Sequence, residues 1–437
     1  MNSKRDKPVP DHGTPLVPRD EEEIKPNLPL TCILCFAALI LGMVQALPIA
    51  ILVPESVDLG LTIGQAVLIV SARPASSLIV LVLQPFMNKL NVHVYLISTG
   101  VVCFLGFGSF YLTVNCPGEY LYWAILARFV TGTTLYLINN KTVVGITNNL
   151  AGDVTTSTTL WETFFFLGIA LGAASGPLMD TSVGFPLTMV ITGSILLADV
   201  ALLSCIFPNP PEDVIASDQG SNFKEAIGSI FSLDMVVYCW IPMIIVGGGL
   251  NYAEGITAEF YRTDYRKSLQ FGGYLQLMTC VVYSVTAAVI GALRNKWPIN
   301  KVMGIVVGLF GAAIFSPFVG PIQQVNPPGV SKLVLSATAL NITMMLYCAI
   351  MMNSVTISAL VLTGNMSAEK ATSLAVNVVN VAYSVGSLVG PVIGGQLLLK
   401  FNYSTVWAAG VPFFISASIF VGIYSFVKYR KNELRLQ

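Results

Sequence analysis

The sequence predicts an all-α membrane protein with twelve transmembrane helices arranged as two six-helix halves. Three observations lead to this prediction. Only 11% of the 437 residues are charged, whereas soluble domains carry about 25%, and the mean hydropathy is +0.73. The apolar residues gather in stretches of about 20 residues, which is the length that spans the hydrocarbon core of a bilayer. A glycine pattern also recurs at matched positions of the two halves.

Twelve apolar stretches are long enough to cross a bilayer. In lipid they must be helices, because each backbone polar group needs a partner within its own segment. The stretches are 30–53, 63–88, 92–114, 120–143, 158–180, 184–207, 234–256, 269–294, 299–322, 332–353, 370–400 and 403–428. The fourth and fifth are the least distinct, since the segment between them is rich in Asn and Thr.

Three polar segments lie outside this plan. Residues 1–29 are charged and rich in proline, a composition that cannot bury a core and predicts disorder. Residues 208–233 form the longest polar linker, and residues 429–437 form a short tail. The linker divides the chain into an N-terminal bundle, 30–207, and a C-terminal bundle, 234–428.

Basic residues are distributed unevenly between the two sides of the membrane. The segments that share a side with the termini hold 16 Lys and Arg residues, and those on the opposite side hold 5. Because cytoplasmic segments carry the excess of basic residues, both termini are predicted to face the cytosol. The protein is expected in a vesicle membrane or the plasma membrane.

Composition and motifs exclude several function classes. Lys plus Arg and Asp plus Glu each number 23, which argues against nucleic-acid binding. The sequence has no phosphate-binding glycine loop and no Cys/His cluster, so neither an enzyme nor a cofactor or metal is expected. The expected partners are a small-molecule substrate, protons and the lipid bilayer, and the chain is expected to be monomeric.

The fifth and eleventh stretches share a pattern of glycines four residues apart, each with a proline. Glycines at this spacing lie on one helix face and allow a neighbouring helix to approach closely, and proline permits a bend. The residues are Gly168, Gly172, Gly176 and Pro177 in the fifth stretch and Gly386, Gly390 and Pro391 in the eleventh. We predict that the two Gly-Pro pairs line the contact between the halves and act as hinges. The alternative is a packing stripe with no role in transport.

These motifs resemble those of the major facilitator superfamily. The segment from Gly168 to Phe185 is similar to the antiporter motif of its fifth helix, and Arg128-Phe-Val-Thr-Gly132 is similar to its fourth-helix R-x-x-x-G motif. The loop after the second stretch departs from the family pattern, with Asn88 where the family has Asp. The matching loop of the second half has Asn295 at that place.

Within the superfamily, the chain most resembles the vesicular amine transporters, in particular their polyamine-transporting branch. The resemblance rests on Glu162, on Gly184-Phe185 and on the segment from Val381 to Gly395. It implies the two-bundle fold, alternating access, and proton-coupled exchange of a small organic cation.

The charged residues that are candidates for a role within the apolar stretches are Arg73, Arg128, Glu162, Asp199 and Glu254. A charge at the bilayer centre costs roughly 2.5–3.5 kcal/mol on insertion scales, so each needs a partner, water or a function. Desolvation raises the pKa of a carboxyl group, which then holds either a proton or a cationic substrate near neutral pH.

Glu254 is the first candidate for the proton-coupling acid. Gly247, Gly248 and Gly249 precede it and are expected to break the seventh helix, as in transporters whose sites are lined by discontinuous helices. The alternative is a solvated acid at the outer end of that helix. Glu162 and Asp199 are the next candidates. For Glu162 the alternative is an acid that reaches out to the cytoplasmic surface, and for Asp199 an acid satisfied by a nearby polar group.

The arginines leave the charge of the substrate open. For Arg128 the resemblance implies a proton relay or gate, and the alternative is a structural ion pair. Arg73 pairs with Glu162 or Asp199, or else it repels cations and favours an anionic substrate. Asn377 and Asn380 stand in the eleventh stretch, where related amine carriers place acids. Asn cannot carry charge, which weakens that route for a monoamine.

Proton-coupled exchange of an amine or polyamine is therefore the leading hypothesis. A facilitative or efflux carrier of another small solute is the second. A receptor or scaffold without transport is the third, because both loop motifs lack their acids. Glu55 and Asp58, just beyond the first stretch, are expected to be solvated loop acids.

The topology can be tested in intact cells. An epitope tag placed before residue 28 is expected to be protected from protease added outside, because the distribution of basic residues puts the terminus in the cytosol. Digestion of that tag in unbroken cells would reverse the predicted orientation.

Overall fold

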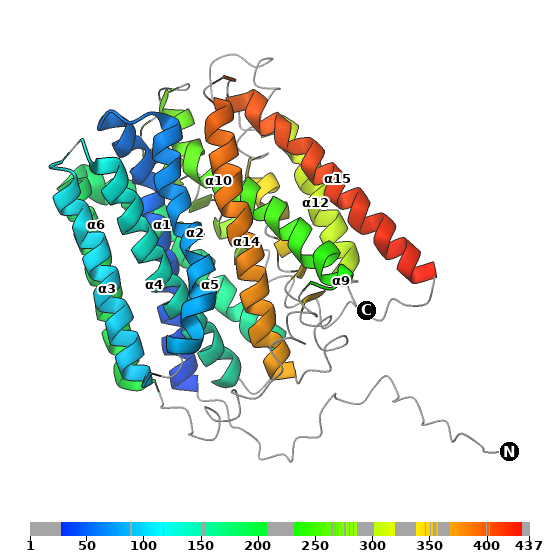
Figure 1. The fold of residues 1–437 in the computed structure, drawn as a ribbon, viewed down its shortest axis with the longest axis horizontal. Coiled ribbons are helices and arrows are strands. Elements are labelled where there is room, and N and C mark those ends of the chain that lie inside the picture. Colours follow the sequence, from blue (N-terminus) through cyan, green and yellow to red (C-terminus); the bar gives the residue numbers. More distant parts are fainter. Residues whose placement is uncertain are drawn as a thin grey trace.

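The computed structural model shows a bundle of long helices (Figure 1). It describes residues 28–87, 90–116, 118–149, 154–207, 231–263, 301–319, 368–398 and 403–430, with short stretches between 266 and 285, between 338 and 356, and at 400–401. The expected tails 1–29 and 429–437 and the linker 208–233 fall almost wholly outside these residues.

Six long helices form the N-terminal group, coloured blue to green in Figure 1. They are α1 (Leu28–Asp58), α2 (Ile63–Met87), α3 (Val92–Thr113), α4 (Tyr120–Asn149), α5 (Val154–Val183) and α6 (Phe185–Ile206). Their apolar side chains meet in one buried core, which includes Leu47, Phe107 and Leu196. Each helix matches one of the first six predicted stretches.

The C-terminal group is α9 (Leu233–Met235), η1 (Val236–Trp240), α10 (Ile241–Thr263), α12 (Lys301–Val319), α14 (Ala368–Leu398) and α15 (Tyr403–Arg430). α9, η1 and α10 follow one another without interruption and together match the seventh stretch. A second core, which includes Val246, Ala312 and Val379, lies among these helices.

Nine helices among the described residues are long and apolar enough to cross a membrane. The ninth predicted stretch corresponds to α12, whose apolar part, Val302–Phe318, is shorter. The eighth and tenth stretches, 269–294 and 332–353, lie partly outside the described residues.

The two groups repeat the same helix pairing. The first helix of each group packs most extensively on the fifth, as α1 on α5 and α10 on α14. The third packs on the last, as α3 on α6 and α12 on α15. The internal repeat inferred from the glycines is therefore also a repeat of packing. Between the groups, α14 lies along α2 (Figure 1).

The glycines of α5 place it against the backbone of α1. A Cβ added at Gly168 would lie 2.8 Å from the carbonyl carbon of Leu39. Gly172 and Gly176 stand in the same way against Met43 and Leu47. The second group repeats this contact, with Gly386 and Gly390 of α14 against the backbones of Ile244 and Gly248 of α10, and Gly394 against the Tyr252 ring. In both helix pairs, these close contacts therefore recur at intervals of four residues.

This packing corrects the predicted position of the two Gly-Pro pairs. Gly176 faces α1 and Gly390 faces α10, so these glycines line contacts within each half rather than between the halves. Small residues are needed where two helices touch backbone to backbone, and Gly176 and Gly390 serve such contacts inside each half. Of the first pair, Pro177 does face the other half, because a Cβ on Gly273 would lie 3.2 Å from its Cγ and would also meet the carbonyl oxygen of Ala173.

The predicted break in the seventh helix is also wrong. α10 runs unbroken from Ile241 to Thr263 through Gly247, Gly248 and Gly249. A Cβ at Gly247 would meet the carbonyl oxygen of Tyr383, and one at Gly249 would lie 2.9 Å from Met345 Sδ. The glycines allow close packing. Their helix stays intact because no water in the lipid competes for its backbone hydrogen bonds.

Replacing Gly168 with Ala is expected to destabilise the protein by roughly 1–3 kcal/mol, because the new methyl group meets the α1 backbone, which cannot move aside. Thermal unfolding of the purified protein in detergent measures the effect. Gly108→Ala is the matched control, since nothing lies within 4 Å of a Cβ at Gly108. Equal unfolding temperatures for the two variants would contradict the close approach.

Candidate functional site

Polar side chains meet where α4 and α14 face each other across the boundary between the halves. Ser384 of α14 donates a hydrogen bond to the Tyr136 hydroxyl of α4, with 3.5 Å between the oxygens. Ser384 is buried and Tyr136 is half-buried. The boundary at this depth is therefore polar, although the helices on either side are mostly apolar.

Asn251 of α10 extends this polar region on the C-terminal side. Its Nδ2 donates to the Tyr383 hydroxyl at 2.9 Å and to Ser387 Oγ at 2.7 Å, and it lies 3.2 Å from the carbonyl oxygen of Gly247. Tyr383, Ser384 and Ser387 all lie on α14. We call Tyr136, Asn251, Tyr383, Ser384 and Ser387 the boundary cluster; all five side chains are uncharged.

Two buried arginines stand on the N-terminal side, next to this cluster. Arg128 of α4 is 0% exposed, and its Nε, Nη1 and Nη2 atoms have no hydrogen-bond partner. Arg73 of α2 is 5% exposed, and its guanidinium carbon lies 5.9 Å from the centroid of the Tyr136 ring. The charge of Arg73 acts on Arg128. The ion pairs found among the described residues involve neither arginine, so Arg73 is paired with neither Glu162 nor Asp199.

The predicted acids lie on three different helices. Asp199 of α6 is 5% exposed and its Oδ2 has no partner. Glu162 of α5 is half-buried and has a contact partner. Glu254 lies in α10, and its side chain is outside the described set. The described contacts thus bring none of these acids together with the arginines.

The two predicted asparagines lie on α14, and a third asparagine, Asn341, lies in the tenth predicted stretch. Asn380 of α14 is half-buried, and the side chain of Asn377, on the same helix, is not described. Asn341 is buried and donates to the Ala312 carbonyl at 2.6 Å and to Ser316 Oγ at 2.8 Å. It therefore fastens its segment to α12.

A carboxyl pair occurs where the sequence predicted solvated acids. Glu55 lies in the last turn of α1, not in a loop, and its carboxyl group lies beside that of Asp180 near the end of α5. Both side chains are half-buried. Two ionised carboxylates that lie together repel each other, which favours a proton on one of them.

The halves are joined at the same end of the bundle, which we call the Asp58 end. There Arg262 of α10 donates to both carboxylate oxygens of Asp58 of α1, at 2.8 and 3.0 Å. A Cβ on Gly395 of α14 would lie 3.5 Å from Val67 of α2. Val67 also packs in a small apolar cluster with Tyr252, Val406 and Trp407. This end is closed by contacts across the boundary.

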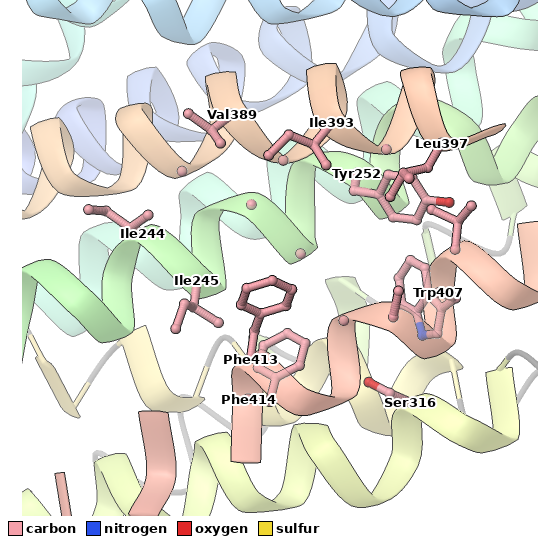
Figure 2. Close-up of a pocket in the computed structure, with 18 of the residues that line it drawn as sticks. Ile244, Ile245, Tyr252, Ser316, Val389, Ile393, Leu397, Trp407, Phe413 and Phe414 are labelled. Carbon is pink, nitrogen blue, oxygen red and sulfur yellow. The ribbon is translucent and has the colours of Figure 1, made fainter. Parts of the chain in front are cut away.

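An apolar cavity of about 270 Å³ lies within the C-terminal group (Figure 2). α14 lines one side with Val389, Ile393 and Leu397, and α15 lines another with Trp407 and Phe413. Val389, Ile393 and Phe413 are also exposed. Among the described residues, no charged side chain lines the cavity, so it suits an apolar group and not a small ion.

Sequence reasoning did not find Tyr136, Asn251, Ser384, Ser387 or Asp180. One signal was present. Asn251 lies four residues after Gly247, and Ser387 lies four residues after Tyr383, so each pair shares one face of its helix. Single polar residues in apolar stretches are frequent, however. Only the fold shows that these come from different helices and meet.

Comparisons with known proteins agree with this architecture. A family model described as the Major Facilitator Superfamily matches residues 34–356. A curated relative, the MFS-type transporter SLC18B1 of Rattus norvegicus, is 22% identical over 250 residues, which cover 57% of this chain and 53% of that protein. The Mus musculus protein of the same name is 21% identical over the same shares. The chain thus spans about half the length of the curated relatives that it matches.

Solved structures match nearly the whole chain. A point mutant of the nucleoside transporter NupG has a TM-score of 0.65 and 13% identity, covering 89% of this chain and 99% of that chain. The transporter FucP in the outward conformation has a TM-score of 0.62 and 15% identity, covering 91% and 98%. At these identities the likeness establishes the fold.

Replacing Asp58 with Asn is expected to loosen the Asp58 end. The pair is partly exposed, at 29% for Arg262 and 56% for Asp58, so its loss costs no more than about 1 kcal/mol. That amount shifts a two-state equilibrium about fivefold. With the exposed cysteines replaced by serine, a Val67→Cys probe is expected to react faster with a polar maleimide.

The swapped pair Asp58→Arg with Arg262→Asp should restore the slow labelling of the Val67→Cys probe. If Asp58→Asn leaves the labelling rate unchanged, the ion pair does not hold this end closed.

Proposed function

Because this chain belongs to the major facilitator superfamily, we propose that it is a secondary active transporter that exchanges a small solute for protons by alternating access. It is a multi-pass membrane protein, and its family and its structural neighbours are transporters. Proton coupling and the identity of the solute are the proposed part.

The observation that carries the proposal is the division of polar and apolar contacts between the halves. Each half is fastened internally by backbone-to-backbone helix packing, which leaves little room for change within it. The boundary has a close backbone contact too, where Gly273 meets the backbone of Ala173 of α5. It also has hydrogen bonds between single side chains, such as Ser384 with Tyr136, and a partly exposed ion pair. Contacts of this kind break and re-form at small cost. Two rigid halves that move about such a boundary give alternating access.

Protons need groups that change charge during the cycle. Asp199 is buried without a partner for Oδ2. Glu55 and Asp180 lie side by side, so a proton shared between them relieves their repulsion. Glu254 and Glu162 remain proposed coupling acids, and Asn377 and Asn380 remain proposed solute contacts. Glu55 and Asp180 lie beside the ion pair that closes the Asp58 end. Loss of their shared proton would add negative charge on the N-terminal half opposite Arg262 of the other half, so proton release favours closure of this end and proton uptake favours its opening.

Two solute classes follow from different observations. The resemblance to vesicular amine transporters suggests a small organic cation, which needs a carboxylate partner such as Asp199 or Glu254. The second class, an anion, is favoured by Arg73 and Arg128, which are buried beside the boundary cluster. Both classes are compatible with exchange against protons.

Uptake into proteoliposomes that contain the full chain tests the proposed function. With an acidic interior, at least one of labelled spermidine, succinate and phosphate is expected to accumulate, and a protonophore should abolish the accumulation. Failure of all three to accumulate and to exchange would contradict it.

Asp199→Asn removes the proton site at constant size. It is expected to reduce gradient-driven accumulation tenfold or more, while solute exchange without a gradient persists. Glu254→Gln is expected to do the same. Glu119→Gln is the matched control, because Glu119 is an exposed acid that only receives a hydrogen bond from Trp123 Nε1 at 2.9 Å. If both variants keep their pH dependence, the coupling acids lie elsewhere, and the Glu55–Asp180 pair is the next to replace.

A further inference from the structure

We infer that Arg73 and Arg128 form an oxyanion-binding site, so that the transported solute carries a carboxylate or phosphate group. This inference deepens the proposed transport function and rests on it, since it names the substrate class of the same boundary site.

The first ground is the state of Arg128. Its side chain is completely buried, and all three guanidinium nitrogens lack a hydrogen-bond partner. Proteins rarely leave such a group uncompensated, because a buried charge without a partner loses its hydration and gains nothing in return. A structural arginine would be paired. An arginine kept for a ligand is expected to look unpaired when the ligand is absent.

The second ground is that a second cation lies close by. α2 and α4 approach so closely that a Cβ on Gly132 would lie 2.9 Å from the carbonyl oxygen of Arg73. Arg128 is one turn before Gly132 on α4. The two charges act on each other, so each makes the burial of the other more costly. Asp199 does not offset them, since its own Oδ2 is unpartnered.

The third ground is position. Arg73 lies over the Tyr136 ring, and the Tyr136 hydroxyl accepts a hydrogen bond from Ser384 of the opposite half. Arg73 is therefore beside the boundary that must open for a solute to enter, and Arg128 lies close enough for the two charges to act on each other. Asn251, Tyr383 and Ser387 offer hydrogen-bonding groups without charge on the other side.

These features fit an oxyanion and disfavour a cation. Guanidinium groups bind carboxylate and phosphate through two parallel, charge-assisted hydrogen bonds. One oxyanion between them would satisfy the unpartnered nitrogens and screen the repulsion between the arginines. A cation at the same place would meet two positive charges. The neutral boundary cluster would then contact the remainder of the solute.

The site can be tested by ligand-dependent thermal unfolding of the purified full-length protein in detergent. Inorganic phosphate, succinate and spermidine are each compared with sodium chloride at equal ionic strength. Phosphate or succinate is expected to raise the unfolding temperature by several degrees. That rise should disappear in Arg73→Gln and in Arg128→Gln, persist in part in Arg73→Lys, and remain in the surface control Lys400→Gln.

The inference is overturned if neither anion exceeds the effect of chloride, or if the rise survives in both glutamine variants. It is also overturned if only spermidine stabilises the protein. The transport assay separates this from the proposed function. If spermidine alone is taken up along the gradient, the proposed transport function holds and the anion site is rejected. If an anion binds but no solute is exchanged, the anion site holds and the transport function is rejected.

A second variant keeps the test independent of the anions chosen. Arg128→Met removes the charge and keeps most of the side-chain length. Without added anion, a ligand-binding arginine predicts an unchanged or raised unfolding temperature, because the uncompensated charge is gone. A structural ion pair predicts a clear fall, because its partner would be left alone in the interior. A fall would overturn the inference.

Discussion

The close approach of α5 to α1, repeated by α14 on α10, is the contact on which the rest of the structure depends. In lipid there is no hydrophobic force between helices, so association relies on packing that brings backbones together. Gly168, Gly172 and Gly176 stand opposite residues 39, 43 and 47 of α1, and Gly386, Gly390 and Gly394 stand opposite residues 244, 248 and 252 of α10. Both ladders use steps of four residues, so each helix pair has a fixed register along its length.

Rigid halves decide where change can occur. Rows of backbone contacts hold each half together, whereas the contacts across the boundary are of mixed kinds. They include the approach of Gly273 to the Ala173 backbone, a 3.5 Å hydrogen bond at mid-depth, the Asp58–Arg262 pair, and the approach of Gly395 to Val67. The same boundary adjoins the Glu55–Asp180 carboxyl pair and the buried arginines. The proposed proton and solute sites therefore lie next to the contacts between the halves.

The helices were predictable from the sequence because a bilayer fixes the length of an apolar segment, and α1 to α6 each match a predicted stretch. The partners of the glycines were not predictable. Spacing shows that Gly168, Gly172 and Gly176 share a face, but not that the face meets α1. Local rules failed at Gly247–Gly249, where three glycines predicted a break and the helix continued. Tertiary packing fills the space that they leave, with α14 at Gly247 and Gly248 and with Met345 and Phe414 at Gly249.

The site was predictable only in part, for the same reason. The depth of Arg73, Arg128 and Asp199 follows from their places in apolar stretches, and all three are buried. What each faces does not follow. The sequence offered Glu162 and Asp199 as partners for Arg73, and only the fold shows that neither pairs with it. Glu55 and Asp58 were expected to be solvated loop acids, since nothing in the local sequence shows that Asp180 and Arg262 lie beside them in the fold.

The distribution of charge also indicates which contacts at the boundary favour its closed or its open state in the proposed exchange cycle. At the Asp58 end opposite charges are paired across the halves, which favours closure there. At mid-depth like charges are held together on one half, which disfavours an empty closed site. A solute that neutralises the arginines changes the free energy of the mid-depth site and leaves the Asp58 end unchanged. A proton that leaves Glu55 or Asp180 changes the free energy of the Asp58 end and leaves the mid-depth site unchanged. Two ligands with opposite effects on one boundary are sufficient for exchange, because each then favours the state that the other leaves.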